Sequence, residues 1–174
     1  VLLHGEESAV LTEAYYVTHK EIAPAVQEGA RRYFDFAVRY GDLLFGTDDV
    51  TRTHVGGENE EVRIEATVPV ATDARPGTLW VRVLRVPGGL LVSLIDLSAQ
   101  TDDAWDAPKH PSTPLDGVRV SILRRGAAAP RVAIASPDAP QLAALRPERS
   151  ERDDAVSLPA FDTWALVLIR DGAA

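Results

Sequence analysis

The 174-residue sequence contains neither cysteine nor methionine. Without cysteine, disulfides and thiolate metal sites are excluded, and the redox compartment is left open. Because position 1 is valine rather than methionine, we expect a processed chain or a fragment. The longest apolar runs have about eight residues against the roughly 20 of a membrane span, and a net charge of −8 is repelled by nucleic acids and anionic membranes. Neither class of partner is therefore expected.

The most informative stretch is residues 78–97, where two apolar, β-branched arms flank a Pro-Gly-Gly sequence. Pro87 pre-sets the entry to a turn, and Gly88 and Gly89 can adopt the positive φ angles that a tight turn needs. The pattern predicts a β-hairpin. Its second arm, 90–97, is apolar on nearly every residue, as in strands buried on both faces. We therefore expect this hairpin to lie in the middle of a packed sheet.

The rest of the C-terminal part predicts further short strands separated by turn signals. Residues 98–116 form a long polar loop, and 141–147 read as an irregular crossing or one helical turn. The strands are expected at 62–68, 118–123, 131–136, 155–158 and 163–170. About seven short strands indicate a mainly β fold, a β-sandwich with Greek-key connections.

The N-terminal part has a different pattern. Residues 1–4 are apolar and precede a polar turn, and apolar residues then recur at three- and four-residue steps from 24 to 44. This predicts a short strand followed by a long amphipathic helix, with Pro24 either at its first position or at a kink. We expect three parts: 1–46 with strand, loop and helix, a linker at 47–59, and the sandwich at 60–174.

Four residues are candidates for substrate binding. His4 and Glu6 follow the first strand, where a strand-to-helix loop would carry polar groups toward substrate hydroxyls. Tyr15 and Trp105 lie in irregular segments, where an aromatic ring could stack on a sugar. Packing against a neighbouring element is the alternative for both rings, and a solvated turn is the alternative for His4 and Glu6. No catalytic set is expected among them.

The remaining polar clusters are weaker signals. Four aspartates could supply oxygen ligands for Ca²⁺, but their spacing has no regular pattern with a glycine pivot, so no metal or cofactor is expected. The aspartates are Asp96, Asp102, Asp103 and Asp106. His19, His54 and His110 are interpreted as isolated and exposed, with no spacing typical of zinc ligands.

Several segments resemble glycoside hydrolase family 66, the family of dextranases and cycloisomaltooligosaccharide glucanotransferases. Leu3-His4-Gly5-Glu6 and Tyr15-Tyr16 are similar to the end of its catalytic barrel, as is the run RYFDFAVRY at 32–40. The run LVSLIDL at 91–97, with Asp96 where asparagine is usual, resembles a strand of its C-terminal β domain, and so does Trp105 in the loop that follows. Val17 follows the tyrosine pair where the family often has proline.

The resemblance implies a secreted bacterial enzyme of several domains. Its (β/α)8 barrel would act on α-1,6-glucosidic bonds of dextran with retention, using an aspartate nucleophile and a glutamate acid/base. In the family pattern both carboxylates lie upstream of residue 1, so no catalytic residue is carried over. The chain would then hold the tail of the barrel, 1–46, and a sandwich that braces it.

Two other functions remain open at this point. The sandwich could be a sugar-binding module that stacks glucose rings on an aromatic side chain. It could also be a structural or partner-binding domain, for example the C-terminal domain of another barrel glycosidase such as an amylase relative. Whether the parent enzyme hydrolyses or cyclises glucan does not follow from the sequence.

Overall fold

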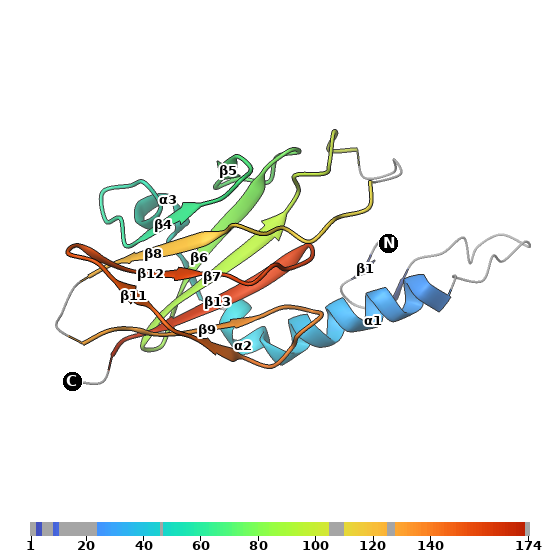
Figure 1. Cartoon of the computed structure of the whole chain (residues 1–174). Helices are drawn as coiled ribbons and strands as arrows, with labels where there is room; N and C mark the ends of the chain where they lie inside the picture. The colour runs from blue at the N-terminus through green and yellow to red at the C-terminus, as the bar shows by residue number, and fades with distance from the viewer. Residues whose placement is uncertain are drawn as a thin grey trace, which may run out of the picture. The chain divides into compact units, whose positions relative to one another are not determined.

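The structure is a computed structural model, and it describes 24–45, 47–104, 110–124 and 128–172, together with the backbone of two short strands at 3–4 and 9–10. Figure 1 shows the course of the chain. The chain divides into two compact units, Val1–Gly41 and Asp42–Ala174. Each unit is described by itself below.

The first unit holds an antiparallel strand pair and a helix. Strand β1, Leu3–His4, pairs with β2, Ala9–Val10. Helix α1 spans Pro24–Arg39, so the proline stands at its first position, where a missing N–H is tolerated. The rings of Phe36 and Tyr40, four residues apart, meet edge to face with their centroids 5.0 Å apart. The helix expected over 24–44 is interrupted after Arg39, and a separate short helix, α2, spans Gly41–Leu44.

The second unit is mainly β, as predicted, and consists of two sheets that form two layers and are antiparallel except for one short strand pair (Figure 1). The wide sheet contains β3 Asp48–Asp49, β5 Val70–Ala71, β6 Leu79–Val86, β7 Gly89–Asp96, β9 Arg131–Ala135, β10 Ala143–Leu145 and β13 Trp164–Arg170. The narrow sheet contains β4 Val62–Glu65, β8 Arg119–Leu123, β11 Glu148–Arg149 and β12 Asp153–Ser157. A short helix, α3, spans Thr51–His54.

The predicted hairpin is confirmed as β6 and β7, and both strands lie inside the wide sheet in the order β10-β9-β13-β7-β6-β3. Gly88 has φ of 73°, and Gly89 pairs with Val86 to close the turn. A Cβ at Gly89 would meet the backbone carbonyl oxygen of Ile169 on β13. Glycine is therefore needed here both for the turn and for the close approach of two strands.

The core lies between the two sheets and follows the period of two along each strand. On β6, Leu79, Val81 and Val83 point inward and are fully buried. Val62 on β4 and Val120 on β8 meet them from the narrow sheet. The alternation that predicted these strands is therefore the alternation that fills the core.

Four short strands lie where no strand was expected. Strand β10 occupies the segment interpreted as a crossing or helical turn, and β11 follows it. Strand β5 pairs in parallel with the start of β6 and lies between the predicted strand at 62–68 and the predicted hairpin. The segment 47–59, interpreted as a linker, carries β3 and α3, and β3 extends the wide sheet. Strands of two or three residues are too short to show a periodicity, so sequence patterns do not reveal them.

Candidate functional site

The four substrate-binding candidates lie outside the side chains that the structure describes. His4 belongs to β1 by its backbone alone, and Glu6, Tyr15 and Trp105 fall in segments outside the described residues. Asp106 and His19 fall outside them as well. The roles suggested for these residues stay predictions, and the site analysis below concerns the second unit.

Three of the four clustered aspartates, Asp96, Asp102 and Asp103, line a cavity of about 420 Å³ together with His110. Two of these carboxylates already serve the local backbone: Asp96 accepts the N–H of Ser98 at 2.9 Å, and Asp102 accepts the N–H of Ala104 at 2.9 Å. Among the described side chains, no group of three potential ligands could hold a metal ion. Asp96 and Asp102 therefore bond to the backbone two residues ahead of them, as turn-forming residues do.

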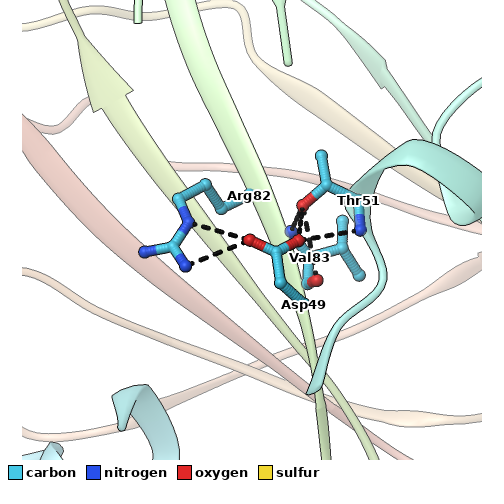
Figure 2. A network of polar contacts seen from close by, with 4 residues as sticks. All are labelled: Asp49, Thr51, Arg82 and Val83. Carbon is cyan, nitrogen blue, oxygen red and sulfur yellow. Dashed lines mark hydrogen bonds and ion pairs between the residues drawn. The ribbon is translucent and has the colours of Figure 1, made fainter. Parts of the chain in front are cut away.

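A tighter polar network lies where β3 and α3 meet β6 (Figure 2). The hydroxyl of Thr51 accepts the N–H of Val83 at 2.8 Å and donates to Asp49 Oδ1 at 2.5 Å. Asp49 Oδ1 also accepts the N–H of Thr51 at 3.0 Å. Arg82 reaches the other carboxylate oxygen with Nε at 3.3 Å and Nη2 at 3.1 Å. One aspartate thus fixes a helix start and an arginine on the neighbouring strand at once.

The same contacts set the ionisation of Asp49. Partial burial raises its pKa, but the hydroxyl and N–H of Thr51 and the guanidinium of Arg82 all stabilise the charged form. The net result is a pKa below the ordinary value for aspartate. Asp49 is therefore a carboxylate at neutral pH and acts as an acceptor, not as a proton donor.

Beside this network is a cavity of about 490 Å³, lined by Asp49 and Arg82 and by the indole of Trp80. Thr72 and Asp73, which follow β5, line it as well. Its volume is within the range of small-ligand sites, about 300–1,000 Å³. It lies along the outer margin of β6, between the short strand β3 and the short strand β5.

His54 was interpreted as isolated and exposed, and that interpretation is wrong. Its side chain is buried, and its Nε2 lies 3.2 Å from Glu61 Oε2 and 2.6 Å from Nη2 of Arg85. The hydroxyl of Thr53 is 2.7 Å from Nδ1. The partners come from residues up to 31 positions away, so no local spacing could have indicated the cluster. Because it joins α3 to β6, we assign it a structural role.

A second arginine–aspartate cluster lies in the narrow sheet. Asp154 on β12 is almost fully buried, and its Oδ1 lies 3.6 Å from Nη2 of Arg124 and 3.4 Å from Nε of Arg149. Arg124 also donates to the carbonyl of Ser150. Two cations around one buried carboxylate compensate its charge, and Asp154 lines neither of the two cavities described above.

Neither Trp80 nor Arg82 was among the residues predicted to bind substrate. The signal that could have pointed to the site is local: Asp49 two residues before Thr51 is typical of a carboxylate that caps the backbone ahead of it. The contact from Arg82 spans 33 positions and needed the fold.

Comparison with known proteins identifies the family. The model of glycosyl hydrolase family 66 matches residues 2–168, nearly the whole chain. This chain belongs to glycosyl hydrolase family 66. The resemblance drawn from the sequence is confirmed.

A solved structure contains the same fold in part of its chain. The cycloisomaltooligosaccharide glucanotransferase of Paenibacillus sp., in complex with cycloisomaltoheptaose, matches with a TM-score of 0.72 at 24% sequence identity. The match covers 94% of this chain but 24% of the Paenibacillus chain, so our chain spans about a quarter of that enzyme's length. No curated protein sequence matches this family 66 chain. Within its described residues, no helix has the length and apolar character needed to cross a membrane.

Proposed function

We propose that this chain is the C-terminal part of a retaining glycoside hydrolase or glucanotransferase that acts on α-1,6-glucan such as dextran. One observation carries the proposal: the family 66 model matches residues 2–168, while the chain spans about a quarter of the Paenibacillus glucanotransferase. The catalytic aspartate and glutamate of the family would then belong to a preceding barrel. Because dextran is a polymer that does not cross membranes, the parent enzyme would be secreted.

In this proposal the N-terminal segment and the sandwich serve one purpose. Residues 1–46, with the strand pair and α1, would complete the barrel, and the sandwich would brace it. The sandwich suits this role because it has its own apolar core between two sheets and so stays rigid. The family match favours this assignment over an amylase-related parent.

The test has two measurements. The purified chain should release no reducing ends from dextran, since it lacks the nucleophile and the acid. A family 66 barrel expressed without the corresponding C-terminal part should have a lower Tm than the intact enzyme. Reducing-sugar release by the isolated chain, or an unchanged barrel Tm after deletion, would contradict the proposal.

A sugar-binding module is the second candidate, and one feature favours it: the cavity beside β6, which combines an aromatic ring with several polar side chains. This candidate is compatible with bracing, since one domain can do both. Its consequence is developed next.

A further inference from the structure

We propose that the cavity along β6, lined by Trp80, Arg82 and Asp49, binds a segment of neutral glucan chain. We refer to it as the β6 cleft. The choice of α-1,6-glucan as the chain rests on the proposed function; the binding of a neutral, hydroxyl-rich ligand rests on the cleft itself.

The first argument is the shape of the strand margin. Strand β5 pairs with Leu79 and Trp80, and β3 pairs with Leu84 and Arg85. Between them, the N–H of Val83 is bonded to Thr51 and its C=O to the N–H of Val50. The part of the β6 margin between β5 and β3 is therefore a short recess with a strand at each end, and it is too short for another β-strand to pair with β6.

The second argument is the chemistry of the walls. Trp80 is partly exposed and lines the cavity, so its indole can offer apolar surface to the C–H face of a sugar ring. Arg82 and Asp49 are beside it, with side chains 38% and 46% exposed. Arg82 uses Nε and Nη2 to hold Asp49, and the described residues leave its Nη1 without a bond. A planar donor and a carboxylate acceptor side by side match a pair of neighbouring hydroxyls.

The third argument is charge. The described charged residues of the lining are two aspartates, Asp49 and Asp73, and two arginines, Arg52 and Arg82. Their formal charges cancel, so the cleft has no net preference for an anion or a cation. A neutral ligand rich in hydroxyl groups can use both kinds of group without an uncompensated charge being buried.

The fourth argument is preorganisation. Arg82 and Asp49 hold each other, and the buried Thr51 holds Asp49, so little side-chain freedom remains to be lost on binding (Figure 2). The indole N–H of Trp80 has no acceptor among the described residues, whereas that of Trp164 donates to Ser93 at 3.0 Å. Replacing Trp80 by phenylalanine therefore removes no internal hydrogen bond and keeps an aromatic face.

The experiment titrates the intact chain with isomaltoheptaose by isothermal calorimetry and by NMR shifts of backbone amides. We expect saturable binding with the largest shifts at Val81 and Arg82, weakened at least tenfold in Trp80→Ala and in Arg82→Met. Trp80→Phe should keep most of the affinity. The matched control is Arg119→Met, which removes an exposed arginine of the narrow sheet and should leave binding unchanged. Thermal unfolding of each variant verifies that it is folded.

Two outcomes would contradict the proposal that the β6 cleft binds sugar. One is no binding at sugar concentrations up to about 10 mM, which is above the dissociation constant of most specific ligands. The other is binding that Trp80→Ala and Arg82→Met leave unchanged. Loss of binding only in Trp105→Ala would give the second result and place the sugar in the long loop. Binding of maltoheptaose but not isomaltoheptaose, with the same sensitivity to Trp80→Ala, would support the cleft while contradicting the α-1,6-glucan of the proposed function. The dextran and barrel assays decide that function independently.

Discussion

Asp49 and Asp154 are both aspartates held by arginine, but they lie in opposite surroundings. The side chain of Asp49 is 46% exposed at the margin of the wide sheet, and that of Asp154 is 2% exposed in the narrow sheet. Asp154 forms ion pairs with two arginines, whereas Asp49 is bonded to one arginine and one threonine. The comparison shows that an aspartate–arginine pair can have two uses. A buried pair compensates an internal charge, and an exposed pair presents preorganised polar groups at the surface.

The largest effect is expected from removing both partners of the buried carboxylate. The double variant Arg124→Met, Arg149→Met keeps the apolar stems but leaves the charge of Asp154 uncompensated. We expect the free energy of unfolding to fall by about 3–5 kcal/mol, measured by urea denaturation.

The control for that variant is Arg119→Met, which breaks the exposed pair with Glu148 and should cost less than about 1 kcal/mol. Adding Asp154→Leu to the double variant should recover most of the loss, because the buried charge is then gone. A double variant no less stable than the control would show that the two clusters do not differ as described.

The next largest effect is expected from removing the hydroxyl of Thr51, which bonds to Asp49 in the exposed cluster of Asp49 and Arg82. Thr51→Val keeps the shape of the side chain but leaves the N–H of Val83 without its acceptor and removes a donor to Asp49. Thr51 is buried, so we expect a loss of about 1–3 kcal/mol in urea denaturation. Thr78→Val, whose exposed hydroxyl bonds to a carbonyl, is the matched control. Equal losses in the two variants would contradict a special role for Thr51.

A smaller effect on stability is expected from Arg82→Met. Both members of its ion pair are more than one-third exposed, so solvent screens the pair and the loss should stay below about 1 kcal/mol. The same variant should lose most sugar binding. The result would distinguish the two ion-pair clusters: the exposed cluster of Asp49 and Arg82 contributes to sugar binding, and the buried cluster around Asp154 contributes to the stability of the fold. A destabilisation comparable with that of the double arginine variant would remove the distinction.

The smallest effect is the pH dependence contributed by Asp49. Its folded pKa is below its unfolded value, so its contribution is fully present above the unfolded pKa and is lost as pH falls through the folded pKa. The Tm advantage of the wild type over Asp49→Asn should therefore shrink as the pH is lowered from about 5. A difference that stays constant from neutral pH to strong acid would contradict the shift.

Most of the sandwich could be predicted because its signals are local. The hairpin is encoded by Pro87-Gly88 and two apolar arms, and β4 by strict alternation of Val62 and Ile64 with charged residues. Strands β3 and β10 could not be predicted, since their few residues show no period and form only because a neighbouring strand offers unpaired backbone groups.

The candidate site was less predictable than the fold. Asp49 and Arg82 are 33 positions apart, and His54 and Arg85 are 31 apart, so each pair exists only after β3 and α3 have joined β6. The aromatic residues predicted to bind sugar, Tyr15 and Trp105, lie in segments expected to be irregular. The aromatic residue of the β6 cleft is on a strand instead, where packing is the usual explanation of a tryptophan.

The way the outer margin of β6 is covered has a consequence for solubility. An eight-residue, mostly apolar strand with a bare flank would be a template for pairing with a second chain, and so for aggregation. Here β5 covers one end, the acidic pair Asp48–Asp49 of β3 covers the other, and the hydroxyl of Thr51 occupies the N–H of Val83 between them. The segment that carries β3 and α3 thus protects the long hairpin from self-association.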